Sequence, residues 1–198
     1  MARPSKWIIG TWLIGLSLTA APVGATEIVI YGFEGSPEGW VIPDWAKASA
    51  DYVAQDFTVS QSQAGEGQHA LELHADFPGG RWTGAYIERE VEVTDWMPFG
   101  RLSADVFVPA DAPQGLTGKL ILTVGDQWTW TEMNRSIPLT PGEWTTISVG
   151  LKPGSMDWKF FPDDNFRASV KKIGVRIESN KDPVYQGSVF VDNIRLAE

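Results

Sequence analysis

Three glutamates stand at alternate positions in the segment Glu88–Glu92. On an extended strand Glu88, Glu90 and Glu92 would share one side, with neighbours about 6.6–7 Å apart. That spacing lies within the range that separates the acid and base of glycoside hydrolases. A charged outer strand that discourages edge-to-edge pairing would give the same pattern. We therefore keep a hydrolase or lyase that uses this row as the alternative interpretation.

Tryptophan offers a different chemistry, because eight of the ten tryptophans follow residue 25. Trp128 and Trp130 would share one side of a strand that continues into Glu132 and Asn134. A flat indole suits the C–H face of a sugar ring, and nearby polar groups suit its hydroxyls. The pattern thus predicts a sugar-binding platform, although two indoles buried under a long loop would fit the same residues.

The other tryptophans divide by their surroundings. Trp82, which follows a Pro-Gly-Gly turn, and Trp158, which stands in a polar loop, are candidates for the rim of the same groove. Trp40 and Trp144 each follow a Gly-containing turn and precede an apolar strand, so we expect both in the core. Two more, Trp45 and Trp96, could equally plug loops.

Any metal site must use oxygen ligands, because the chain has no cysteine and only two histidines. His69 and His74 are five residues apart on one strand and would face opposite sides. Calcium is the plausible ion, since it takes carboxylates and carbonyls at loop junctions. Glu34 and Asp192 would meet if the first and last strands pair, which makes them the candidate calcium ligands. The alternative is that both are ordinary turn acids.

The elements that must position these residues are short strands. Alternating apolar and polar residues recur between Gly, Pro, Asn and Asp, which is typical of an antiparallel sandwich or barrel. We expect an all-β fold, a two-sheet antiparallel β-sandwich of the jelly-roll type, from about ten strands. The strands are predicted at 27–33, 54–60, 69–75, 84–93, 102–109, 119–124, 129–137, 145–151, 172–179 and 188–196.

Strand parity assigns the remaining candidates to the non-core side. Ile173, Val175 and Ile177 form one apolar row, so Arg176 and Glu178 must point the other way. By the same argument Asp105 and Tyr86 lie opposite core residues of their own strands. We expect these four side chains to bind sugar hydroxyls beside the indoles.

Charge and length exclude several classes of protein. The chain has 198 residues, with 16 Lys and Arg against 25 Asp and Glu, and a net charge of -9. Such an acidic chain without a basic cluster does not predict a nucleic-acid binder. No linker or repeat divides it, which favours one domain over residues 26–198 and a monomer.

The N-terminus has the order of a secretory signal peptide. Arg3 and Lys6 precede an apolar stretch over 7–21, and small residues end at Ala25. About 15 apolar residues are too few to span a bilayer, so we predict cleavage after Ala25 rather than an anchor. The product would be secreted or periplasmic, free of the membrane, with 14 basic and 25 acidic residues and a charge of -11.

Several segments, in this order and spacing, resemble bacterial carbohydrate-binding modules of the galactose-binding-like jelly-roll type, as found attached to mannanases and other endoglycanases. The segments are Phe33-Glu34-Gly35 with Gly39-Trp40, Trp128-Thr129-Trp130, Leu139 to Thr146, and Phe190 to Ile194. The resemblance covers essentially all of the chain after Ala25. It implies structural calcium near Asp192 and Glu34, and a ligand groove that includes Trp128, Trp130 and Arg176.

Taken together, the sequence predicts non-catalytic binding of a neutral polysaccharide. The negative charge disfavours anionic glycans, so β-mannan or β-glucan is expected. Such modules usually accompany a catalytic domain, so this protein would either act alone or join a separate glycanase as a noncovalent partner. Laminarinase-type hydrolases also carry alternate acids on one strand, but Arg89 departs from their pattern. A calcium-stabilised extracellular protein-adhesion domain is the remaining alternative.

Overall fold

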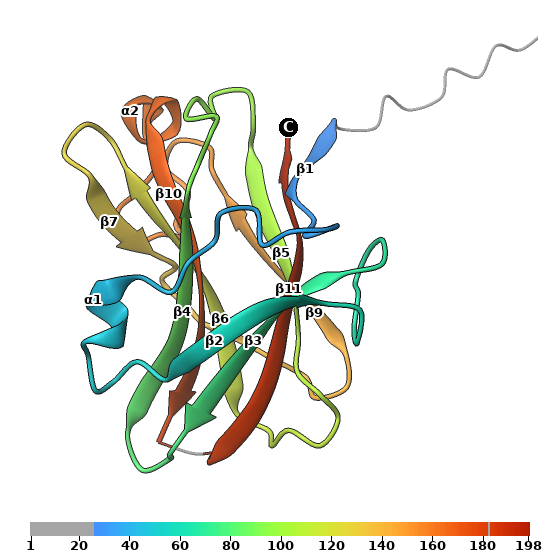
Figure 1. Cartoon of the computed structure of the whole chain (residues 1–198). Helices are drawn as coiled ribbons and strands as arrows, with labels where there is room; N and C mark the ends of the chain where they lie inside the picture. The colour runs from blue at the N-terminus through green and yellow to red at the C-terminus, as the bar shows by residue number, and fades with distance from the viewer. Residues whose placement is uncertain (1–25, 182) are drawn as a thin grey trace, which may run out of the picture.

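Two antiparallel sheets pack face to face in the computed structural model, which describes residues 26–181 and 183–198 (Figure 1). Sheet A runs β2, β3, β11, β5, β9, with β1 also paired to β11, and sheet B runs β4, β10, β6, β7, with β8 also paired to β6. The β-sandwich predicted from the sequence is thereby confirmed. The predicted signal peptide, residues 1–25, lies outside the described residues.

The strand bounds follow the alternation of the sequence closely. Sheet A contains β1 (Glu27–Tyr31), β2 (Ala54–Ser60), β3 (Ala70–Phe77), β5 (Arg101–Phe107), β9 (Trp144–Gly150) and β11 (Tyr185–Ala197). Sheet B contains β4 (Trp82–Glu90), β6 (Leu116–Val124), β7 (Thr129–Glu132), β8 (Ile137–Pro138) and β10 (Val170–Asn180). The single strand predicted over 129–137 is in fact two, because the chain leaves sheet B between β7 and β8.

Two short helices lie outside the predicted strands. They are α1 (Asp44–Lys47) and α2 (Asp164–Ala168). The Asp163 carboxylate accepts the Phe166 N–H at 2.7 Å, which caps the first turn of α2. In α1 only Ala46 is buried, so the adjacent side chains are free to reach a neighbouring surface. Among the described residues, neither helix is long and apolar enough to cross a membrane.

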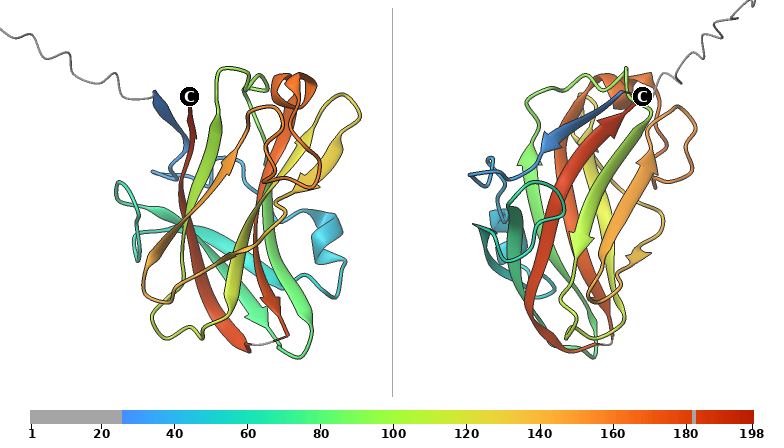
Figure 2. Two further views of the ribbon diagram at one scale, coloured as in Figure 1. Left: turned by 180° about the vertical axis from the view of Figure 1, so that it is seen from behind. Right: turned by 90° about the vertical axis from the view of Figure 1, so that its right-hand side faces the viewer.

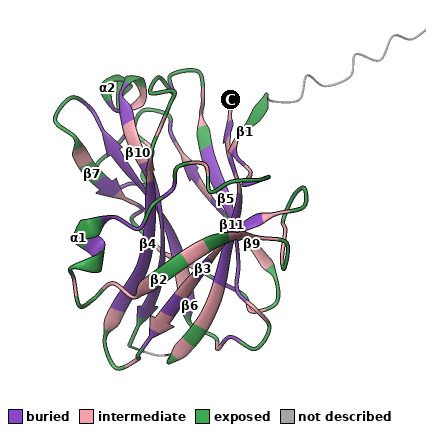
Figure 3. Cartoon of the chain, viewed as in Figure 1, coloured by how far each residue is buried: buried purple, intermediate pink, exposed green. Residues whose placement is uncertain are grey.

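The core fills the space between the sheets. Ile173, Val175 and Ile177 are buried there, as their alternation predicts, and Trp40 joins them. Figure 3 shows β4, β6 and β10 buried along most of their length. Trp144 was expected in this core, and that expectation is wrong. Because Trp144 is paired with Phe107 across β9 and β5, it lies on the outer face of sheet A.

The first and last strands form an antiparallel pair in which Glu27 faces Ala197. The Glu198 N–H donates to the Thr26 carbonyl at 3.2 Å, so residue 26 and the C-terminus lie side by side (Figures 1 and 2). This pairing was the condition for bringing Glu34 and Asp192 together.

Candidate functional site

The outer face of sheet B collects most of the aromatic and charged side chains that the sequence singles out. Alternate residues of its strands point away from the core, and the antiparallel register places them in rows across the sheet. One row is Glu90, Lys172, Thr123 and Trp130; the next is Glu88, Gly174, Ile121 and Glu132; the third is Tyr86, Arg176 and Lys119. Helix α1 and the β6–β7 turn lie on this same side of the sheet (Figure 1).

Five aromatic rings, which we call the aromatic band, gather on this face: Trp45, Tyr52, Trp82, Tyr86 and Trp130. The ring centroids of Trp45 and Trp130 are 5.7 Å apart, and both rings approach Tyr86 within 5.4 Å. The Trp45–Trp130 pair is edge-to-face and both pairs with Tyr86 are tilted, so each ring is braced by two others. Trp45 is 44% exposed and Trp130 41%, so the band presents rigid indole surface to solvent.

A network of charges lies beside the aromatic band. Arg176 bonds both Glu132 and Glu178, and its Nε donates to Glu178 Oε1 at 2.7 Å. Lys159 also binds Glu132, while the Ser136 hydroxyl donates to Glu178 Oε2 at 2.7 Å. Arg176 and Glu178 are each only 6% exposed, so this pair is nearly closed to solvent.

The network shifts the pKa values of Glu132 and Arg176. Burial disfavours the charged form of Glu132, but bonds from Lys159 and the charge of Arg176 outweigh it and lower the pKa of Glu132 to about 2. Burial opposes the charged form of Arg176 as well, yet Glu178 and Glu132 raise its pKa. Glu132 and Arg176 are therefore both charged at neutral pH. The face carries four cations (Lys119, Lys159, Lys172, Arg176) and four carboxylates (Glu88, Glu90, Glu132, Glu178), so it is balanced within a chain of net charge -9.

Comparison with known proteins identifies the family. The family model described as mannanase, galactose-binding domain-like matches residues 31–193. The chain belongs to this family. The resemblance drawn from the sequence is therefore confirmed, and the match spans both sheets and the whole aromatic band.

Solved structures share the fold of this galactose-binding-like domain. A CBM27-1 module from Caldicellulosiruptor saccharolyticus, solved with mannohexaose, is 19% identical with a TM-score of 0.58, covering 86% of this chain and 96% of that one. A CBM28 module specific for non-crystalline cellulose is 13% identical with a TM-score of 0.62, and the match covers 86% of this chain and 94% of that one. A third structure comes from work on the promiscuous specificity of carbohydrate-binding modules of the β-sandwich superfamily. It is 14% identical with a TM-score of 0.56, and the match covers 86% of this chain and 62% of that one. No curated protein matches the chain in sequence.

Two members of the aromatic band of this domain, Trp45 and Tyr52, were missed from the sequence. The segment that carries them has no strand alternation and lies along the edge of β4 through the isolated pairs of Val41 with Glu88 and Tyr52 with Gly84. From that edge Trp45 reaches over Tyr86 to Trp130. The available signal was the composition alone, since two aromatic residues stand in a segment without strand alternation.

Tyr86 and Trp82 lie on the predicted face, in different roles. Tyr86 was expected to bind ligand, but it is 1% exposed beneath Trp45 and Trp130, and its hydroxyl donates to Glu88 at 3.0 Å. Burial and the Glu88 charge raise its pKa. Gly174 makes this possible, because a Cβ there would stand 2.4 Å from the Tyr86 hydroxyl. Trp82 is half-buried, with the Arg176 guanidinium 5.4 Å from its ring centre.

Trp158 and Asp105 do not belong to this face, and these two expectations are wrong. Trp158 is fully buried, packs on Phe166 and donates its indole N–H to the Gly150 carbonyl at 2.8 Å. Asp105 lies on the outer face of sheet A, where it accepts bonds from Thr146 at 2.6 Å and Arg195 at 2.8 Å. Parity placed Asp105 outside the core correctly, but it could not decide which sheet carries the strand.

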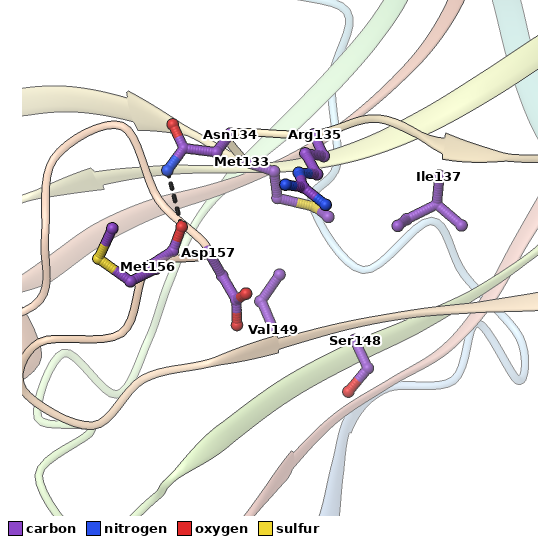
Figure 4. A pocket seen from close by; sticks show the side chains of 8 residues that line it. All are labelled: Met133, Asn134, Arg135, Ile137, Ser148, Val149, Met156 and Asp157. Atoms are coloured by element: carbon purple, nitrogen blue, oxygen red, sulfur yellow. Dashed lines mark hydrogen bonds between the residues drawn. The ribbon is translucent and has the colours of Figure 1, made fainter.

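Trp128 and Asn134 leave the strand that was predicted to carry them. Trp128 stands before β7 in a turn, with φ at 53° and an exposed ring, so it shares no strand face with Trp130. Asn134 turns toward another edge of the sandwich, where its amide donates to the Met156 carbonyl at 2.7 Å (Figure 4). It lines a separate pocket of about 460 Å³ with Arg135, Ser148 and Asp157.

Of the three glutamates in the possible catalytic row, Glu88 and Glu90 stay together on β4 and Glu92 leaves the strand. Strand β4 ends at Glu90, and Glu92 lies in the bend beyond it, bonded to Arg89. Glu88 is buried, with its two oxygens held by Tyr86 and by Lys172 at 2.8 Å. The expectation of three acids on one strand face is therefore wrong, because the strand is two residues too short.

The candidate calcium ligands line a common pocket of about 260 Å³ together with Glu66. Asp192 is buried, and its carboxylate accepts N–H groups of Gly65 at 2.8 Å and Asn193 at 2.6 Å. Burial, aided by Glu34, raises the pKa of Asp192, a cost that a cation would relieve. The donors are all oxygen, which suits calcium. Although three acids line the pocket, no three acidic or histidine side chains of the described residues are placed to hold one ion together, so carbonyls and water would complete the coordination.

Proposed function

We propose that this domain binds a neutral polysaccharide of the β-mannan or β-glucan type on the outer face of sheet B, without cleaving it. The observation that carries the proposal is the aromatic band, in which exposed Trp130 and Trp45 are held rigidly over buried Tyr86. Rigid indoles bury large apolar area at little entropic cost when a sugar ring stacks on them.

The surrounding residues would bind sugar hydroxyls or support the residues that do. Glu132, Lys159 and Lys172 reach the surface and would bind hydroxyl groups. Arg176 and Glu178 are buried, so they would hold Glu132 and Trp82 in place beneath the sugar. Trp82 would extend the apolar floor, and Trp128 would add a contact at the exposed turn.

The choice of a neutral glycan is supported by charge and by relatives. The face itself is balanced and the chain around it is acidic, which would repel an anionic glycan. The family is named for mannanases, and one structural neighbour was solved with mannohexaose. The export expected from the N-terminal sequence would bring the domain to such polymers outside the cell, as a monomer beside a separate glycanase.

Affinity electrophoresis tests this function directly. The mature protein is run through gels containing galactomannan, glucomannan, mixed-linkage β-glucan, xylan or alginate, and reducing-sugar release is assayed in parallel. We expect retardation by the mannans or the β-glucan, none by alginate, and no sugar release. Release of sugar would support the hydrolase or lyase alternative, and no retardation by any polymer would support the adhesion domain.

A structural calcium ion at the pocket of Glu34 and Asp192 is part of the proposal. It would connect β11 to the loops that carry Glu34 and Gly65–Gly67, and hold these carboxylates together. Its role would be stability, because the pocket involves sheet A and not the aromatic band.

Chelation should lower the thermal midpoint of the wild-type domain. A ligand present at about 100 times its Kd stabilises by about 2.7 kcal/mol, which corresponds to about 5–10 °C for a chain of this size. We expect this loss on adding EDTA, its reversal by excess calcium, and little response to EDTA in Glu34→Gln. The measurement is differential scanning fluorimetry. A wild-type midpoint that EDTA leaves unmoved would exclude the calcium ion.

A further inference from the structure

A second polar cluster stands at the far end of the cross-strand row that contains Trp130. The row runs from Trp130 on β7 over Thr123 on β6 and Lys172 on β10 to Glu90 on β4. Neighbouring strands are about 4.8 Å apart, so the two ends of the row are separated by about 14 Å. A ligand chain that lies across the strands would therefore meet the indole at one end and the charges at the other.

The cluster opens into its own pocket, of about 410 Å³, lined by Gly39, Val41, Glu88, Arg89, Glu90 and Lys172. Lys172 Nζ lies 2.8 Å from Glu88 Oε1 and 3.9 Å from Glu90 Oε1. The Glu88 side chain is 5% exposed, whereas that of Glu90 is 72% exposed. Glu88 therefore holds the ammonium in place, and Glu90 offers carboxylate oxygens to solvent.

This pairing of a donor with an acceptor matches a pair of hydroxyl groups. An ammonium only donates hydrogen bonds and a carboxylate only accepts them, whereas each hydroxyl can do both. Val41 at the rim is 47% exposed and supplies apolar contact for a ring face. The opposite charges leave the pocket without a strong preference for an ionic ligand.

We propose that Lys172 and Glu90 form a second sugar subsite, which binds two adjacent hydroxyls of one pyranose unit while Trp130 stacks on another unit of the same chain. The inference rests on the proposed function and deepens it, because it gives the ligand a direction across β7, β6, β10 and β4. It also makes affinity depend on chain length. Oligosaccharides too short to reach from Trp130 to Glu90 use only one end.

Isothermal titration with manno- and gluco-oligosaccharides of increasing length tests the subsite. The variant is Glu90→Gln, which keeps the shape of an exposed side chain and removes its charge. Losing a charged hydrogen bond weakens binding by about tenfold, so we expect that loss for the longest oligosaccharides and none for the shortest. Glu143→Gln, an exposed acid in the turn before β9, is the control and should bind as the wild type does at every length.

The outcomes separate the subsite from the function on which it rests. Equal affinity of Glu90→Gln and wild type at every length overturns the subsite and leaves the aromatic band as the binding site. An equal loss at every length also overturns it, since Glu90 would then act beside Trp130. If the wild type binds no oligosaccharide or polymer, both proposals fail.

Discussion

Replacing Trp130 by alanine should abolish retardation of the domain in gels that contain its polysaccharide. The exposed Trp130 ring offers the largest rigid surface on β7 and is braced by Trp45 and Tyr86. Central aromatic anchors of this kind cost about 2 kcal/mol or more when truncated, which is a loss of about 30-fold. We expect a loss of this size to remove detectable retardation.

The fold should survive the same change. Trp130 is 41% exposed, and its two aromatic pairs are worth about 1–3 kcal/mol together, or about 2–12 °C in the thermal midpoint. Trp128→Ala is the matched variant. Trp128 is another exposed indole, in the turn two residues before Trp130, and no aromatic neighbour among the described residues braces it. We expect Trp128→Ala to weaken binding less than Trp130→Ala does. Unchanged retardation of Trp130→Ala would remove the aromatic band as the binding site.

Replacing Arg176 by methionine should have the largest effect on stability. The change leaves Glu132 and Glu178 charged, nearly buried and without their shared cation. Removing one partner of a buried ion pair costs about 3–5 kcal/mol, which lowers the thermal midpoint of a domain of this size by about 6–20 °C. Lys159→Met is the control, since Lys159 bonds the same Glu132 from an exposed position and is worth about 1 kcal/mol or less.

The effect of Arg176→Met should also depend on pH. The folded pKa of Glu132 is about 2 and its ordinary value is 4.5, so its ionisation stabilises the fold above about pH 4.5 and that contribution is lost as the pH falls toward 2. The difference in free energy of unfolding between wild type and variant should therefore narrow over this window. Urea unfolding at pH 7 and pH 3 measures it, and an equal difference at both would contradict the role given to Glu132.

The fold could be predicted because half-buried strands alternate apolar and polar residues along the sequence. Rows such as Ile173, Val175 and Ile177 fix which side is buried, and turn residues bound each strand. Parity fails where a strand ends, as at Glu90 and Glu132, because nothing local marks the last paired residue. It also fails to choose between two outer faces, which is why Asp105 was grouped with Arg176.

The site was predictable only in part, since it depends on contacts between distant segments. Trp130 could be found from its own strand, and Arg176 and Glu178 from theirs. Trp45 could not, because a four-residue helix carries no period and its ring lies over Tyr86 only after the 41–53 segment settles on β4. Whether an indole is exposed or buried is likewise decided by the segments that pack around it, as the buried Trp158 demonstrates.

The pairing of β1 with β11 sets how the domain responds to mechanical load. Glu27 faces Ala197, so the polypeptide enters and leaves at one corner, and tension between residue 26 and the C-terminus pulls the two strands apart sideways. Their hydrogen bonds are then loaded one after another, as in a zipper, and not all at once. The hydrogen bonds between β4 and β10 do not carry this load, so the aromatic band stays assembled while β1 separates from β11.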